Sequence, residues 1–209
     1  ILMRILLVYP ETPGTFWSFK KAVRFVSKRA SGTPLGLLTV AAMLPEAWER
    51  KLVDMNVARL RDRDIEWADY VFLGGMSIHA EQIKNVIARA NALGTPVVGG
   101  GPAFTMTPEE YPGTAHMVLN EAEITFPRFL QDLLNGTAEP VYTTDDFPDI
   151  TTTPAPEWDL LDLKRYSSVD VQYSRGCPFN CEFCSITWLN GHRPRTKDTD
   201  QFLSELQSL

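Results

Sequence analysis

Cysteine is scarce in this sequence, and its distribution is uneven. Only three of the 209 residues are cysteine, and all three lie between positions 177 and 184. A disulfide framework needs spaced, paired cysteines and an oxidising compartment, so an odd and clustered set does not suit one. Thiols grouped this closely in a reducing compartment indicate a metal site.

The sequence also lacks long apolar runs, a secretory signal and an excess of basic residues. No stretch approaches the roughly 20 apolar residues of a membrane-spanning helix, and the N-terminus lacks the charged, apolar and small-residue order of a signal peptide. We therefore expect a cytoplasmic protein. The formal net charge of -6 argues against a nucleic-acid-binding protein, which needs a basic face to displace phosphate counterions.

Short apolar runs recur along the first half of the sequence. Residues 4–9 form a continuous run of strand-forming residues, as expected of a strand buried on both faces. The intervals that follow leave room for crossover connections between parallel strands. Further strands are predicted at residues 51–54, 70–73, 96–98 and 116–119.

Helical patterns fill several of these intervals. Thr33 is a candidate N-cap and Pro34 suits the first helical position, so a helix is predicted from there to about Pro45. Two later helices are predicted to end at glycines, which are common C-terminal caps. They cover residues 83–93, before Gly94, and residues 126–133, before Gly136.

The chain divides into three parts. Strands that alternate with helices predict an α/β fold, with a doubly wound, Rossmann-like parallel sheet over residues 1–137. Residues 138–168 are rich in proline and lack a helical period, which predicts a linker that packs its apolar side chains. Residues 169–209 contain a predicted strand at 169–173, the cysteines and a final helix. Because these elements cannot bury a core, we expect a truncated second domain.

The cysteine spacing narrows the choice of metal. Cys177, Cys181 and Cys184 provide soft thiolate ligands that suit an iron-sulfur cluster or zinc. Structural zinc sites use four protein ligands, so a closed Cys3His site would have to recruit His192. Two classes of protein therefore remain: one with an iron-sulfur cluster, and a zinc-stabilised binding module.

Glycines follow two neighbouring predicted strands. In a doubly wound sheet, ligands bind outside the carboxyl ends of the strands, and glycine lets the backbone approach a bulky ligand. A glycine run after a strand can also be a simple turn. The candidate ligand-binding residues are Gly74, Gly75, Ser77, Gly99, Gly100 and Gly101.

The cysteine loop resembles a known family. CxxxCxxC with an aromatic residue, Phe183, before the last cysteine is similar to the defining motif of the radical S-adenosylmethionine (SAM) superfamily. The resemblance implies that Cys177, Cys181 and Cys184 each bind one iron of a [4Fe-4S] cluster, with the fourth iron free for SAM. It also implies that Phe183 lies near the adenine of SAM, and that residues 169–173 begin a partial (β/α) barrel.

Several further segments resemble the cobalamin-dependent (class B) radical SAM enzymes, and in particular the subgroup that includes hopanoid methylases. The resemblance implies methylation of an unactivated carbon by methylcobalamin, a small-molecule or lipid-like substrate, and an electron donor such as flavodoxin or ferredoxin. A cyclisation or rearrangement with the same cofactors is the alternative. The segments that carry this resemblance are residues 9–11, 16–19, 33–37, 74–77, 99–102, 120–123 and 158–166.

The sequence departs from the pattern of the classical cobalamin-dependent methyltransferases in one respect. Their DxHxxG signature, whose histidine coordinates cobalt, is absent, and the loop after the first strand contains no histidine. We therefore expect cobalt to lack a histidine ligand on its lower face. His79 and His116 are interpreted as surface or strand-end residues.

One segment near the N-terminus combines basic and apolar residues. Its pattern predicts a basic amphipathic helix that lies either on an anionic membrane or in solvent. The basic residues are Lys20, Lys21, Arg24, Lys28 and Arg29, and the apolar ones are Val23, Phe25 and Val26.

Overall fold

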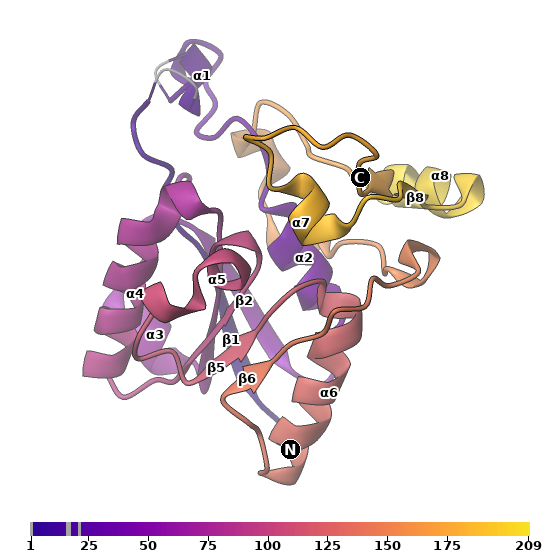
Figure 1. Cartoon of the computed structure of the whole chain (residues 1–209). Helices are drawn as coiled ribbons and strands as arrows, with labels where there is room; N and C mark the ends of the chain where they lie inside the picture. The colour runs from indigo at the N-terminus through magenta and orange to yellow at the C-terminus, as the bar shows by residue number, and fades with distance from the viewer. Residues whose placement is uncertain (1, 16–17, 21) are drawn as a thin grey trace.

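The computed structural model of the chain describes residues 2–15, 18–20 and 22–209. Within these residues, six parallel strands form one sheet in the order β2-β1-β3-β4-β5-β6 (Figure 1). The predicted α/β fold with a parallel sheet is therefore confirmed. The strands are β1 (Arg4–Tyr9), β2 (Glu49–Asp54), β3 (Tyr70–Gly74), β4 (Val97–Gly100), β5 (His116–Val118) and β6 (Val141–Tyr142).

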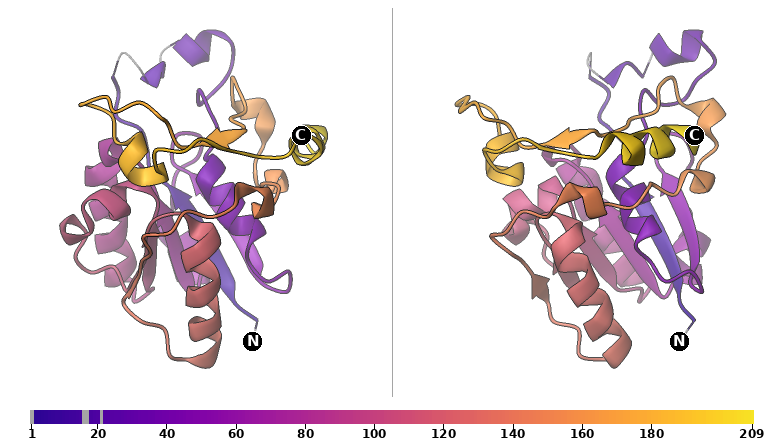
Figure 2. Two further views of the ribbon diagram at one scale, coloured as in Figure 1. Left: turned by 45° about the vertical axis from the view of Figure 1, so that its right-hand side comes forward. Right: turned by 90° about the vertical axis from the view of Figure 1, so that its right-hand side faces the viewer.

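Helices cover both faces of the sheet, as Figures 1 and 2 show. Two helices pack on one face, and three pack on the other. The first pair is α2 (Leu35–Ala42) and α6 (Ala122–Asn135). The second set is α3 (Asp62–Trp67), α4 (Ala80–Ala92) and α5 (Pro102–Met106). Short 3₁₀ turns lie at Ser77–His79, Pro108–Glu110, Ile150–Thr152, Trp158–Leu160 and Leu163–Arg165.

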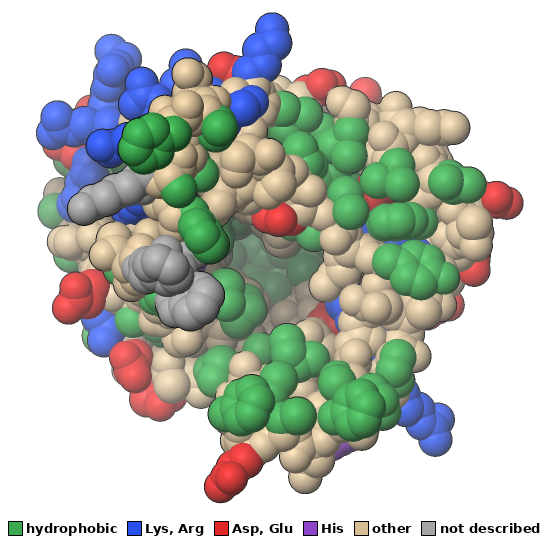
Figure 3. Space-filling model, turned by 90° about the horizontal axis from the view of Figure 1, so that it is seen from above, with side chains coloured by type: hydrophobic (Ala, Val, Ile, Leu, Met, Phe, Trp, Pro, Cys, Tyr) green, Lys and Arg blue, Asp and Glu red, His purple; other side chains and the backbone are tan. Residues whose placement is uncertain are grey.

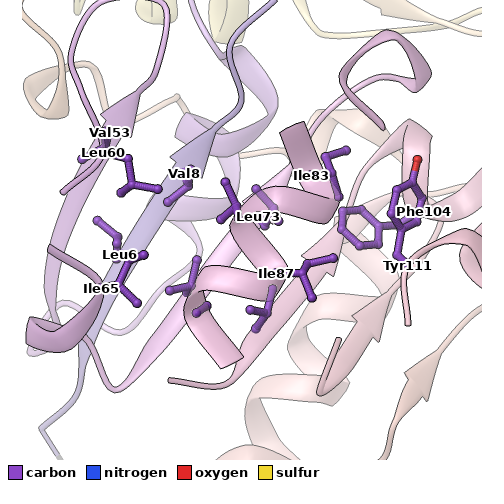
Figure 4. Packing of buried hydrophobic residues seen from close by; sticks show 14 of the residues in the cluster. Leu6, Val8, Val53, Leu60, Ile65, Leu73, Ile83, Ile87, Phe104 and Tyr111 are labelled. Atoms are coloured by element: carbon purple, nitrogen blue, oxygen red, sulfur yellow. The ribbon is translucent and has the colours of Figure 1, made fainter. Parts of the chain in front are cut away.

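Alternation along β1 explains these two layers. Successive side chains of a strand point to opposite faces, so the four consecutive buried apolar residues of β1 contribute to two cores. Ile5 and Leu7 pack in the cluster under α2 and α6. Leu6 and Val8 pack in the other cluster, with Ile65 and the residues labelled in Figure 4. Both cores are therefore anchored on the same central strand.

Two helices end at the predicted glycines, whereas the predicted start of α2 differs from the structure. α4 ends just before Gly94, and α6 is capped by Gly136, which adopts a left-handed conformation with φ of 71°. The prediction that Thr33 caps α2 was wrong, because the helix begins at Leu35 and has no side-chain cap. The Thr33 hydroxyl instead accepts a hydrogen bond from the Asp170 backbone amide.

Three elements of the six-stranded sheet and of the helices that cover it were not predicted. α3 and α5 are six and five residues long, too short for a helical period to stand out. β6 has two residues and pairs with β5, so the sheet extends past residue 137 into the segment interpreted as a linker. That segment is packed as expected at Ile150 and Trp158, which are buried, whereas Phe147 is exposed.

The predicted strand at residues 169–173 was wrong. A strand needs a hydrogen-bonded neighbouring strand, and these residues have none among the described strands: the Asp170 backbone amide donates to the Thr33 side chain instead. The strand of this region is β7 (Ser174–Arg175), which pairs antiparallel with β8 (Arg195–Thr196). Two helices, α7 (Ile186–Asn190) and α8 (Thr199–Gln207), complete the segment.

The predicted basic helix is reduced to one turn, α1 (Ala22–Phe25). Lys21 of this pattern lies outside the described residues, as do Phe16 and Trp17 of the resemblance segment 16–19. Among the residues that are described, no helix has both the length and the apolar character to cross a membrane.

Candidate functional site

A cleft opens at the carboxyl ends of the central strands. It encloses about 500 Å³ and is lined by residues that follow β1, β3, β4 and β5. Figure 3, which looks onto this end of the molecule, shows the hollow. Most of the lining is apolar, including Leu37, Phe72, Val98 and Met106. This is where a doubly wound sheet binds its ligands.

All six candidate ligand-binding residues lie on the wall of this cleft, namely Gly74, Gly75, Ser77, Gly99, Gly100 and Gly101. Packing within the protein accounts for glycine at two of these positions. A Cβ on Gly99 would lie 2.3 Å from Cε1 of Phe104, and Gly101 adopts a φ of 81° at the start of α5. Glycine at these two positions lets α5 pack closely on β4. Here the wall of the cleft consists of backbone without side chains.

Tyr9, at the end of β1, also lines the cleft. The loop that follows it is the one that contains no histidine. Burial, followed by the charges of Asp54 and Asp170, raises the pKa of Tyr9 to about 12. The phenol is therefore neutral at physiological pH. It offers the cleft a hydroxyl rather than an anionic ligand.

The C-terminal segment covers one side of the cleft and is held there by ion pairs. Gln172, Arg175 and Ile186 belong to the lining. Arg175 Nη1 lies 2.7 Å from Glu121 Oε2, and its Nη2 lies 2.8 Å from Glu123 Oε1. Arg195 Nη2 lies 2.6 Å from Glu121 Oε1. These side chains are less than a fifth exposed, so solvent screens the pairs weakly.

The ion pairs set the charge state of Glu123. Burial alone would raise the pKa of its carboxyl, but the hydrogen bonds and charge of Arg175 outweigh burial and lower the pKa below its ordinary value. Burial also opposes the charged form of Arg175. Its hydrogen bonds and charge interactions with Glu123 and Glu121 outweigh burial and raise its pKa. Glu123 and Arg175 are therefore both charged at neutral pH.

His79 is not the surface residue that the sequence suggested, because it is only 2% exposed. Its Nδ1 accepts a hydrogen bond from the Met76 amide at 3.1 Å, which leaves Nε2 to donate to Thr12 Oγ1 at 3.1 Å. Burial lowers its pKa. The neutral ring thus links the loop after β1 to the loop after β3. His116 lies at the start of β5, as the strand-end interpretation expected.

The three cysteines share one exposed loop beside the cleft. Gly176 at its start has a φ of 88°, and a Cβ there would lie 2.3 Å from the Arg193 carbonyl oxygen, so only glycine fits. The thiol donor set suits an iron-sulfur cluster. The side chains do not converge, however: nowhere in the described part of the chain do three His, Cys, Asp or Glu side chains lie close enough to hold a metal ion. Phe183 is 94% exposed and His192 is exposed.

The sequence pattern did not identify the ion-pair residues as functional. Glu121 and Glu123 stand in a segment noted for its resemblance, and Arg175 stands two residues before Cys177. A basic residue beside the cysteine motif and two acidic residues after a strand were the only signals. Their pairing depends on the tertiary fold.

An all-parallel sheet with a glycine-walled, mainly apolar cleft at its carboxyl edge defines a cofactor-binding α/β domain. Residues 23–130 match the B12 binding domain family, and the chain belongs to that family. The apolar lining and bare backbone wall fit the broad face of cobalamin. The sequence expectation of a cobalamin-binding domain is therefore confirmed at this level.

The chain is also similar along almost its whole length to two curated proteins. It is 44% identical to an uncharacterised methyltransferase of Synechocystis, over 99% of this chain and 39% of that protein. It is 34% identical to the hopanoid C-2 methylase of Rhodopseudomonas palustris, over 99% and 40%. A bacteriochlorophyllide d C-12(1)-methyltransferase of Chlorobaculum tepidum is 24% identical, over 88% and 41%. The chain spans about two fifths of the length of these relatives.

Proposed function

We propose that this chain is the cofactor-binding part of a cobalamin-dependent radical SAM enzyme that methylates an unactivated carbon. The proposal assigns Cys177, Cys181 and Cys184 to a [4Fe-4S] cluster with a free corner for SAM, and Phe183 to the adenine. When bound, the cluster and SAM would supply a radical, and cobalamin the methyl group. An electron-donor protein such as flavodoxin or ferredoxin would reduce the cluster.

The position of the cysteine loop beside the cleft carries this proposal. Arg175 and Ile186, which flank the loop, both line the cleft. A reaction in which one cofactor makes a substrate radical and the other donates a methyl group to it requires that both face the same substrate, and a cysteine loop beside the cobalamin cleft supports such an arrangement. The names of the relatives, which are methyltransferases and a methylase, support the same reaction class.

Metal analysis separates the cluster from a zinc site. The chain is reconstituted anaerobically with iron and sulfide, and about four irons and four sulfides per chain are expected. Cys181→Ser should lose most of this iron, whereas Asn180→Ala in the same loop should keep it. Stoichiometric zinc without iron would instead support the binding-module alternative.

Cobalamin binding is tested by titrating the chain with hydroxocobalamin and following its absorbance spectrum. Gly36 lines the cleft, and a Cβ there meets nothing within 4 Å, so Gly36→Leu should fold and obstruct the cofactor. Gly14→Leu is the matched control, because Gly14 is equally open and lies outside the cleft lining. Equal affinity of both variants for hydroxocobalamin would mean that cobalamin binds outside this cleft.

Product analysis distinguishes methylation from the cyclisation or rearrangement alternative. The whole enzyme is incubated with methyl-labelled SAM, a reductant and a bacterial lipid extract that contains hopanoids. Label in a stable carbon-bound methyl group of an extracted product is expected. A product of altered skeleton without label would replace methyl transfer by the alternative.

A further inference from the structure

The part of the chain around α1, between β1 and α2, projects from the sheet (Figure 1). We call the described residues 18–20 and 22–33 the basic lobe. In the sequence, residues 18–33 include five basic residues and no acidic residue, in a chain whose net charge is -6. Of the described basic side chains, Lys20 is paired with Glu11, and Arg24 and Arg29 are exposed. The lobe therefore carries a local positive charge opposite to that of the whole chain.

The tip of the basic lobe also exposes apolar side chains. Phe25 is 91% exposed and Val26 is 60% exposed, whereas Val23 between them and the body of the protein is buried. A single exposed apolar side chain is common on soluble proteins, but here two neighbouring ones occur together in a segment whose charged residues are all basic. Phe25 and Val26 thus form a small apolar tip with Arg24, Lys28 and Arg29 close by in the sequence.

The lobe is attached to the body on its C-terminal side, so its tip has a defined direction. The Arg29 amide donates to the Arg165 carbonyl at 2.7 Å, and Lys28 Nζ donates to the Lys164 carbonyl at 2.8 Å. Ala30 forms a parallel bridge with Tyr166, which is buried. These contacts hold the lobe against residues 164–166.

The basic lobe stands at the same end of the molecule as the mouth of the cleft. Figures 1 and 2 show it beyond the carboxyl ends of the strands, and Figure 3 shows basic and hydrophobic side chains together at one edge of the face that contains the hollow. The same face carries the cysteine loop, with Phe179, Phe183 and Trp188 exposed. A flat surface in contact with the lobe would therefore lie next to the cleft mouth.

We propose that the basic lobe binds the surface of an anionic lipid bilayer, with Phe25 and Val26 inserted among the acyl chains and the cations at the headgroups. Two neighbouring apolar side chains suit a bilayer, which deforms around a small wedge and needs no matching pocket. An acidic protein partner would bury a larger apolar patch than this tip provides. The proposal is independent of the reaction and of either cofactor.

Vesicle co-sedimentation tests the proposal with the full chain. Binding to vesicles of phosphatidylglycerol and phosphatidylcholine is expected, with little binding to phosphatidylcholine alone and a decrease at high salt. The variant Arg24→Ser/Phe25→Ser should lower binding. Loss of one cation near an anionic surface reduces binding about fivefold, and loss of an inserted phenyl ring reduces it roughly tenfold more.

The matched control is Arg128→Ser/Leu134→Ser, which removes one exposed cation and one exposed apolar side chain from α6. It should bind as the unchanged chain does, and circular dichroism should give the same spectrum for both variants. Binding to neutral vesicles as strong as binding to anionic vesicles would overturn the proposal. So would an equal loss of binding in the lobe variant and the control variant. So would retention by an acidic protein such as flavodoxin, lost in the lobe variant, without any binding to vesicles.

Discussion

Arg175 donates a hydrogen bond of 2.7 Å from Nη1 to Oε2 of Glu121, which precedes α6 at the carboxyl edge of the sheet. Arg175 belongs to β7, two residues before the first cysteine. This ion pair therefore helps to join the cobalamin-binding domain to the segment that carries the cysteine loop. Since Arg175 also contacts Glu123, the guanidinium spans the start of α6 and fixes β7 against the cleft.

Arg175→Met should destabilise the chain, because it leaves two nearly buried carboxylates with fewer partners. Glu121 keeps Arg195, and Glu123 keeps the Thr153 hydroxyl, so the loss is smaller than for an isolated buried charge. We expect the free energy of unfolding to fall by about 2–3 kcal/mol at neutral pH. Urea denaturation followed by circular dichroism measures it.

Arg165→Met is the control for this prediction. Arg165 also pairs with a carboxylate, that of Asp162, but both side chains are about half exposed. Exposed pairs contribute little to stability because solvent screens them, so the free energy of unfolding of this variant should be close to that of the unchanged chain. A similar loss of unfolding free energy in both variants would mean that the buried ion pairs of Arg175 stabilise the fold no more than an exposed pair does.

The lowered pKa of Glu123 predicts acid sensitivity. A carboxyl whose pKa is depressed in the folded state contributes stability above its ordinary pKa, 4.5, and loses it as pH falls through the folded value. Glu123→Gln should therefore narrow the stability difference between neutral pH and pH below 4.5. Urea denaturation at a series of pH values measures this, and parallel curves for the two proteins would contradict the assignment.

The layers of the fold could be predicted from the sequence because they depend on local patterns. The apolar run at residues 4–9 and the glycines after two helices gave correct elements. The edge strand β6 could not be predicted, since two residues carry no period. The strand at residues 169–173 was predicted wrongly because its alternation of apolar and polar residues does not reveal which neighbour it will find.

The candidate site divides in the same way. The glycines and cysteines form contiguous motifs, so the sequence alone could select them as candidates, and the glycines do line the cleft. Arg175, Glu121 and His79 function through contacts between residues far apart in the chain, and no local pattern contains that information. His79 was expected at the surface because a single histidine has no period that reports its burial.

Because His79 is buried, the stability of the folded chain should fall when the pH is lowered from 7 to 5. Its pKa is lowered by burial, so the unfolded chain takes up a proton below the ordinary value of 6.5 while the folded chain stays neutral. Stability is therefore complete above pH 6.5 and decreases below it. His79→Asn retains an acceptor for the Met76 amide and does not titrate, so its stability should change less between pH 7 and pH 5. An equal decrease in thermal midpoint over this range would refute the role of His79.

Gly99→Ala should disturb the cleft wall more than its size suggests. The new methyl group would lie 2.3 Å from the ring of Phe104, which is fully buried and cannot move aside freely. We expect a loss of about 1–3 kcal/mol in unfolding free energy, as for other overpacked cores. Gly36→Ala, also on the cleft wall, meets nothing within 4 Å and lies in α2, so it should raise stability by up to about 1 kcal/mol. Opposite signs in urea denaturation would show that protein packing, and not only the cofactor, requires glycine at position 99.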